Sequence, residues 1–98
     1  MADILVLNLS DDLDIVQGAV KIAARCRLVE WKTEMSLVED LSFRAQLGYA
    51  VSQNYRFAII YSDNEHSEGM VSIKDLLNRT QNTVKLSELE SYLFTLKH

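Results

Sequence analysis

The sequence predicts an α/β protein: one domain over residues 1–98, with a five-stranded mixed sheet and helices on both of its faces. Strand-length apolar runs alternate with segments of helical periodicity in the order β-α-β-α-β-β-β-α, and strands joined through helices run parallel. The segment 62–69, between the third and fourth strands, has eight residues, which is too short for a parallel crossover. We therefore expect the fourth strand to run antiparallel to the third.

Two strand–helix units are predicted in the first half of the chain. Residues 4–9 (ILVLNL) form a strand-length apolar run, and Asp11 and Asp12 can cap the helix that follows. The buried stripe of that helix should consist of Ile15, Ala19, Ile22, Ala23 and Cys26. Residues 28–33 (LVEWKT) alternate between apolar and polar and indicate a second strand.

The second helix has two candidate starting points. Ser36 and Glu39 stand three residues apart, as in a capping box, and Ser42 is an alternative cap. Its apolar stripe comprises Phe43, Leu47, Ala50 and Val51.

The second half of the chain contains the most apolar segment. Residues 57–61 (FAIIY) indicate a strand buried on both faces and hence the centre of the sheet. Residues 62–69 indicate a loop and residues 70–77 a strand. A turn at 78–82, a short strand at Val84 and Leu86, and a closing helix capped by Ser87, with Leu89, Leu93 and Leu96 buried, complete the chain.

The composition limits the function. The net charge is −4 and the isoelectric point about 5.0, whereas a free-standing nucleic-acid binder usually has a basic surplus. The chain lacks the ~20-residue apolar run of a membrane span, and it starts without the features of a signal peptide. Its single cysteine fits a reducing compartment. We expect a cytoplasmic protein with no membrane association.

Nothing in the sequence indicates an active site within these 98 residues. His66 and His98 are the only histidines, and neither belongs to a metal-binding spacing, so no metal is expected. Cys26 lies on an apolar helix stripe and is expected to be buried against the sheet rather than to act as a nucleophile. A nucleophile elbow and a glycine-rich phosphate loop are both missing, and no cofactor is expected.

Glu65 and Lys74 flank the point where ligands bind in open α/β sheets, beyond the carboxyl end of the central strand. A glutamate can accept a hydrogen bond from an exocyclic base amine, and a lysine can donate to a base carbonyl or ring nitrogen. The alternative reading is a pair of ordinary solvated charges, which are common in loops and on exposed strand faces. The spacing of Glu65 and Lys74 alone leaves both interpretations open.

The segment QLGYAVSQNYRFAIIYSDNEHSEGMVSIKDL (46–76) resembles the anticodon-binding domain at the C-terminus of class II aminoacyl-tRNA synthetases, most of all that of histidyl-tRNA synthetase. Family members carry a helix of the form S-L-x-x-Q-L-K-Y-A, then F-A-x-I-I-G, E-L-x-x-G-x-V-x-V-K-D-L and V-x-L-x-E-L-x-x-x-L. The matches run in order from residue 42 to residue 93. The resemblance implies a three-layer α/β/α sandwich, in agreement with the element order above.

The resemblance also implies a partner, the anticodon loop of a tRNA, which the isolated chain should bind weakly. It places base contacts on Glu65 and Lys74 and further tRNA contacts on Arg44 and Gln46. The catalytic domain of such a synthetase would lie outside this chain, so whether the chain is part of an enzyme stays open. A homodimer and other domains of a parent protein are further partners that the resemblance allows.

Departures from the family pattern support an alternative function. Gly48 replaces the usual lysine or arginine of Q-L-K-Y-A, Ala45 replaces a frequent lysine, and Tyr61 replaces the glycine after the third strand. Arg44 could compensate for one lost positive charge. Domains of this kind also serve as interaction or dimerisation modules in translation-regulatory proteins, and a net charge of −4 suits that role.

Overall fold

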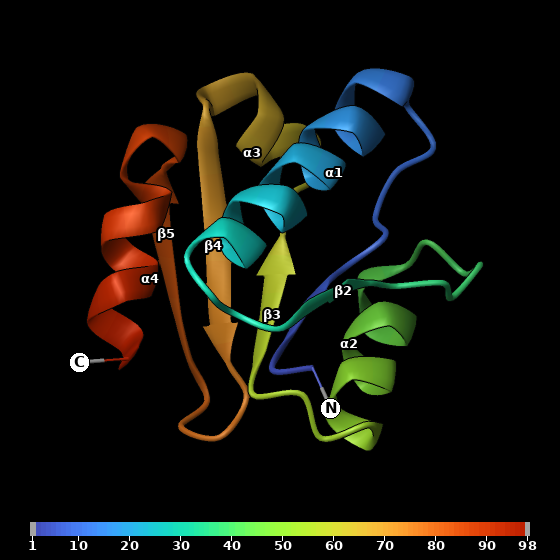
Figure 1. Cartoon of the computed structure of the whole chain (residues 1–98). Coiled ribbons are helices and arrows are strands. Elements are labelled where there is room, and N and C mark those ends of the chain that lie inside the picture. Colours follow the sequence, from blue (N-terminus) through green and yellow to red (C-terminus); the bar gives the residue numbers. More distant parts are fainter. Residues whose placement is uncertain (1, 98) are drawn as a thin grey trace.

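The computed structural model describes residues 2–97 and contains one five-stranded sheet, in the order β2-β1-β3-β4-β5 (Figure 1). Met1 and His98 lie outside the described residues. The prediction that His98 belongs to no metal site therefore also lies outside them. The strands are β1 (Ile4–Val6), β2 (Thr33–Met35), β3 (Phe57–Ile60), β4 (Met70–Asp75) and β5 (Thr80–Lys85). The helices are α1 (Leu13–Leu28), α2 (Phe43–Ser52), α3 (Asp63–Glu68) and α4 (Leu89–Lys97), with a 3₁₀ turn η1 at Leu86–Glu88.

The central strand is β3, as the sequence predicted. It runs parallel to β1 and antiparallel to β4, with Ile59 opposite Ile73. All four residues of β3 are buried, because helices cover both faces of the sheet at this position. The predicted mixed sheet and the antiparallel fourth strand are therefore confirmed.

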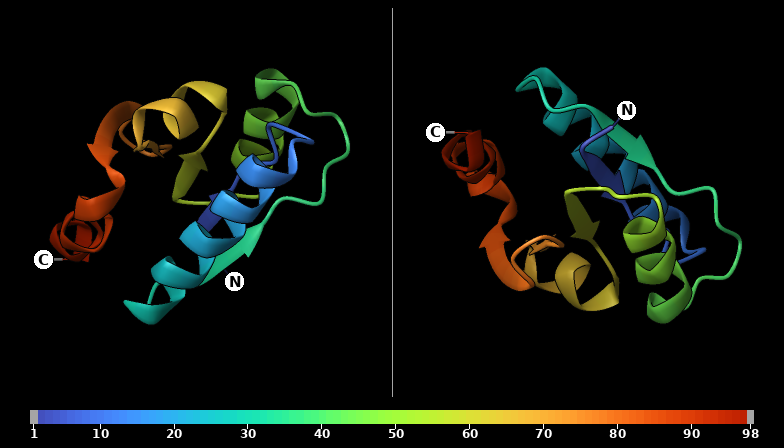
Figure 2. Two further views of the ribbon diagram at one scale, coloured as in Figure 1. Left: turned by 90° about the horizontal axis from the view of Figure 1, so that it is seen from above. Right: turned by 90° about the horizontal axis from the view of Figure 1, so that it is seen from below.

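Helices pack on both faces of the sheet and make three layers (Figure 2). One face carries α1 and α4, whose buried stripes join alternate strand residues such as Ile4, Phe57 and Ile73 in the larger core cluster. The other face carries α2 over β1 and β3, where Ala50 packs with the smaller cluster. This smaller helical layer leaves the β4–β5 part of the second face without a long helix over it.

The prediction of a strand at 28–33 was wrong. Helix α1 continues to Leu28, the chain turns at Glu30 with a positive φ of 68°, and β2 starts only at Thr33. The apparent alternation arises because Trp31 turns inward from this connection. Its ring packs edge-on against Phe57, with 5.5 Å between centroids, and its indole nitrogen donates to the carbonyl of Leu93 at 3.1 Å.

Helix α2 starts after Ser42, the second of its two candidate cap residues. The Ser42 hydroxyl accepts from the backbone nitrogen of Ala45 at 3.3 Å, and the helix begins at Phe43. Ser36 instead accepts from the nitrogen of Val38 at 3.2 Å within the preceding loop. The predicted capping box of Ser36 and Glu39 therefore does not form.

The loop expected at 62–69 contains the short helix α3. Ser62 is its N-cap residue, and Gly69 ends it in the left-handed region with φ of 66°. The same small polar residues that suggested a turn also cap helices, because their side chains bond to nearby backbone groups. The element order therefore gains a helix between β3 and β4.

The C-terminal elements also differ in their boundaries. Strand β5 starts at Thr80, inside the segment expected to be a turn, and Ser87 lies in η1 rather than at the cap of α4. The predicted stripe of α4 is correct, since Leu89 and Leu93 are fully buried and Leu96 packs on the same cluster.

Cys26 is buried in the larger core cluster together with Ile22 and Ala23, as predicted. Burial raises the pKa of its thiol to about 11. We expect thiol reagents to modify the folded protein slowly, and Cys26→Ser to lower the free energy of unfolding by about 1–3 kcal/mol, because a more polar hydroxyl is then buried. Reagent kinetics and urea unfolding measure the two effects. Rapid modification of the native protein would contradict the placement.

Candidate nucleic-acid interface

Lys74 projects from the face of the sheet that α2 only partly covers. Along β4, Val71 and Ile73 point into the core cluster beneath α1 and α4. Because side chains alternate along a strand, Ser72 and Lys74 point to the opposite face. Thr83 lies opposite Ser72 on β5, and its side chain therefore shares that face. We call this surface the open face and define it by β4 residues Met70, Ser72 and Lys74 and β5 residues Gln81, Thr83 and Lys85.

Helix α2 borders the open face at its Lys74 end. Its residues Leu47 and Val51 line a cavity of about 320 Å³ together with Lys74, Leu76 and Arg79. Arg44 is exposed and precedes Leu47 by three residues on the same side of the helix. The predicted basic residue Arg44 is therefore an exposed cation one turn before the part of α2 that lines this cavity.

Glu65 reaches the open face from α3. One carboxylate oxygen, Oε1, accepts from the backbone nitrogen of Ser62 at 2.9 Å, which is the return bond of a capping box. The same oxygen also accepts from the Ser62 hydroxyl. The other oxygen, Oε2, lies 3.4 Å from the Ser72 hydroxyl. Ser72 thus stands between Glu65 and Lys74, and the structure places both predicted base-contacting side chains on one surface.

The ionisation of Glu65 is favoured by its surroundings. Burial by itself would raise the pKa of the half-buried carboxyl, but the hydrogen bonds from Ser62 and Ser72 outweigh it and hold the pKa below its ordinary value. A carboxylate that stays ionised only accepts hydrogen bonds. Glu65 can therefore recognise N–H groups and not carbonyl groups.

Gln46 has a structural role. Its side chain is fully buried. Its amide nitrogen donates to the carbonyls of Val38 and Asp40 at 2.9 and 2.8 Å, and its oxygen accepts from the nitrogen of Asn8 at 3.0 Å. Because the amide nitrogen and oxygen of this side chain both bond to the protein, Gln46 ties the loop before α2 to the segment after β1 and is not available for the tRNA contact that the sequence predicted.

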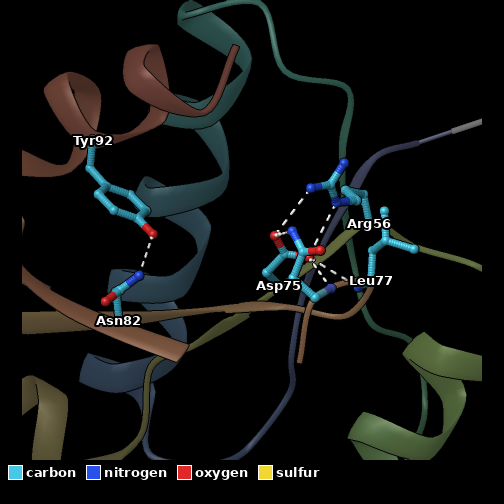
Figure 3. Close-up of polar contacts among 6 residues, drawn as sticks. Arg56, Asp75, Leu77, Asn82 and Tyr92 are labelled. Atoms are coloured by element: carbon cyan, nitrogen blue, oxygen red, sulfur yellow. Dashed lines mark hydrogen bonds and ion pairs between the residues drawn. The ribbon is translucent and has the colours of Figure 1, made fainter. Parts of the chain in front are cut away.

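The turn between β4 and β5 is ordered by Asp75 (Figure 3). Its carboxylate accepts from the Arg56 guanidinium at 3.1 and 3.2 Å and from the backbone nitrogens of Leu77 and Asn78, both at 3.0 Å. Arg79 follows in the left-handed region with φ of 58°. The turn therefore holds Arg79 at the end of the open face, where it lines the cavity beside Lys74.

Two cations of this surface, Arg79 and Lys85, were missed by sequence reasoning. Lys85 was missed because β5 was assigned too few residues, since a strand from 80 to 85 places Lys85 on the face of Lys74 by alternation. Arg79 was missed because its position depends on the turn that Asp75 orders. The open face thus carries Lys74 and Lys85 and ends at Arg79, although the net charge of the whole chain is −4. A local basic surface can attract phosphate in spite of an acidic total charge.

The ion pairs of the chain make its stability dependent on pH. Hydrogen bonds from Arg56 lower the pKa of Asp75, and hydrogen bonds from Arg25 lower that of Glu90. A carboxyl with a lowered folded-state pKa stabilises the fold above its unfolded value, about 4, and this stability is lost as the pH falls further. We expect the free energy of unfolding to decrease from about pH 5 downward, with a flatter decrease in Glu90→Gln. Urea unfolding at constant ionic strength measures it, and a pH-independent free energy would refute it.

Within residues 2–97, no group of three or more His, Cys, Asp or Glu side chains is arranged to hold a metal ion. None of the helices described for this chain combines the length and the apolar character that a membrane crossing requires.

Comparison with known proteins shows the family to which this chain is similar. The family model described as "Anticodon binding domain" matches residues 3–96. A histidine–tRNA ligase of Xanthomonas axonopodis pv. citri is 35% identical over 78 residues, which is 80% of this chain and 16% of the relative. That of Methanocaldococcus jannaschii is 26% identical over 89 residues, 91% of this chain and 21% of the relative. The chain thus spans about a fifth or less of the length of these relatives.

Solved structures share the fold. A histidyl-tRNA synthetase from Nostoc superposes with a TM-score of 0.87 at 22% identity, over 99% of this chain and 23% of that one. The RNA binding domain of a threonyl-tRNA synthetase from Cryptosporidium parvum superposes with a TM-score of 0.81 at 12% identity, over 96% of this chain and 23% of that one. Because the family model covers residues 3–96, the chain belongs to the anticodon-binding domain family.

Proposed function

We propose that this chain binds the anticodon loop of a tRNA on its open face, and that the tRNA is a histidine tRNA. The observation that carries the proposal is the shared surface of an acceptor, Glu65, and a donor, Lys74. The Ser72 hydroxyl lies 3.4 Å from Glu65, and Ser72 precedes Lys74 by two residues on the same face of β4. A base edge that offers both an amine and a carbonyl or ring nitrogen matches this pair. Guanine is such a base, and the complement of the histidine codon CAC is GUG.

The basic residues around the pair have a second role in this proposal. Arg44, Arg79 and Lys85 would contact phosphates, which position the loop without reading its sequence. The cavity lined by Leu47, Val51 and Leu76 together with Lys74 and Arg79 would accept an unstacked part of the loop.

The named relatives support histidine as the amino acid, because they are histidine–tRNA ligases. In such a protein this chain would bind and orient the tRNA in the cytoplasm, and aminoacylation would take place on another domain. Its contribution would be binding energy and placement rather than chemistry.

A second candidate function is an interaction or dimerisation module that has lost tRNA reading. The net charge of −4 and Gly48, at the position where the family usually carries a cation, favour it. Sedimentation measures the self-association that a dimerisation module requires. Binding that does not distinguish a GUG loop from other loops would favour this second function.

The proposal is tested first with the isolated 98-residue chain and an anticodon stem-loop. We expect a dissociation constant weaker than about 1 μM at physiological salt, because few cations face the RNA and phosphate contacts supply most of the affinity. Affinity should rise as salt is lowered. Fluorescence anisotropy over a salt series measures both, and submicromolar binding at physiological salt would refute the expected weakness.

A further inference from the structure

Glu65 is held by a chain of hydroxyl groups that crosses three elements of the fold. Ser72 lies on β4 with an exposed fraction of 1%, and its hydroxyl is 3.4 Å from Glu65 Oε2 and 2.8 Å from the Thr83 hydroxyl on β5. Ser62 holds the other carboxylate oxygen from the start of α3. A carboxylate on a six-residue helix is thus fixed from two sides.

The direction of the hydrogen bonds in this chain follows from the carboxylate. An ionised carboxylate only accepts, and a hydroxyl has one proton to donate. Ser72 therefore donates to Glu65, and Thr83 donates to Ser72. The opposite direction would turn an oxygen lone pair of Ser72 toward a negatively charged oxygen.

The two oxygens of Glu65 consequently differ in availability. Oε1 accepts two hydrogen bonds from Ser62, one of them from the backbone at 2.9 Å. Oε2 makes a long contact of 3.4 Å with Ser72 and has lone-pair capacity left for another donor. An oxygen that is oriented and still available is the arrangement that base selection requires.

We propose that Ser72 and Thr83 are positioning residues that orient Glu65 Oε2 on the open face, so that this oxygen selects a base with an exocyclic amine. The inference rests on the proposed function and adds the chemical group that is read. Inosine differs from guanosine only by lacking the exocyclic amine. Replacing guanine by inosine in the loop therefore removes the selected group and little else.

The test compares stem-loops carrying GUG with loops in which each guanine in turn is inosine, by NMR titration of the whole chain at low salt. We expect the wild-type chain to prefer guanine at one position. Ser72→Ala should reduce this preference about fivefold, the value of one hydrogen bond, and Thr83→Val should reduce it less. Ser67→Ala is the matched control, because its hydroxyl bonds to the carbonyl of Asn64 within α3, and it should leave the preference unchanged.

A second readout is independent of RNA. The side-chain carboxyl of Glu65 should titrate at a higher pH in Ser72→Ala than in the wild type, because a donor to the ionised form is lost. This measurement requires the folded chain and not the ligand. A merely structural role for Ser72 would change stability and leave the Glu65 titration where it was.

The outcomes separate this inference from the proposed function. A wild-type preference for guanine that survives both Ser72→Ala and Thr83→Val would overturn the positioning role and leave anticodon binding in place. A wild-type chain that binds guanine and inosine loops equally would overturn base reading by Glu65, and this inference with it. If Ser72→Ala does not fold, the guanine preference of Thr83→Val, a substitution at an exposed residue, tests the positioning role by itself.

Discussion

Replacing Gly18 with alanine is expected to lower the free energy of unfolding by about 1–3 kcal/mol, as overpacking of a filled core does. A Cβ at this position in α1 would lie 2.6 Å from Cε2 of Tyr61. The Tyr61 ring cannot move aside freely, because it is buried and its hydroxyl is bonded to Nδ1 of His66 at 2.7 Å. The clash therefore outweighs the gain of about 1 kcal/mol that alanine brings to a helix.

Gly48 provides the matched control for this prediction. It also lies in a helix, but an added Cβ there meets no atom within 4 Å. Gly48→Ala should raise the free energy of unfolding by up to about 1 kcal/mol. Urea unfolding of both variants gives the comparison. Equal effects at the two glycines, or an undiminished cost of Gly18→Ala in a Tyr61→Ala background, would show that the contact with Tyr61 does not explain the result.

Replacing Lys74 with alanine should weaken binding of a GUG stem-loop by about 1–3 kcal/mol and weaken binding of loops with other anticodons less. The reason is that a base contact discriminates between sequences, whereas a phosphate contact supports all of them. Glu65→Gln should mainly reduce discrimination, since the amide keeps one acceptor oxygen and loses the charge. Arg44→Ala should instead weaken all loops equally and flatten the salt dependence.

Lys21→Ala is the control for charge in this series, because Lys21 is an exposed lysine on α1 and belongs to the opposite helix layer. NMR titration at low salt keeps the affinities measurable. Equal losses on GUG and other loops for Lys74→Ala would reduce Lys74 to a general electrostatic contact. No loss in either the Lys74 or the Glu65 variant would make both residues ordinary solvated charges.

The central part of the fold could be predicted from the sequence because its signals are local and strong. The apolar run 57–61 can be satisfied only by burial on both faces, and the short connection after it dictated an antiparallel neighbour. The errors occurred where one pattern serves two structures. Alternation at 28–33 came from Trp31 turning into the core beyond α1, and the small polar residues at 62–69 suit both a turn and the capped helix α3.

The candidate site could be predicted in part. The face of the sheet to which Lys74 points could be predicted, because alternation along a strand requires only that the strand itself is assigned correctly. Gln46 was predicted to contact tRNA, but it is buried. This burial could not be predicted, because it depends on carbonyls of the loop at 38–40 and on Asn8, which no local sequence pattern brings together. The chain of hydroxyl groups from Ser62, Ser72 and Thr83 could not be predicted from the sequence either, since the contact between Ser72 and Thr83 depends on the register between β4 and β5.

The binding surface itself is the central claim, and chemical-shift mapping tests it most directly. A ¹⁵N-labelled chain is titrated with a GUG stem-loop at low salt, and the shifted amides are placed on the structure. We predict shifts along β4 and β5 around Ser72, Lys74 and Thr83, with α1 and α4 unaffected. Shifts confined to the α1–α4 face, or no shift at any RNA concentration, would contradict the account.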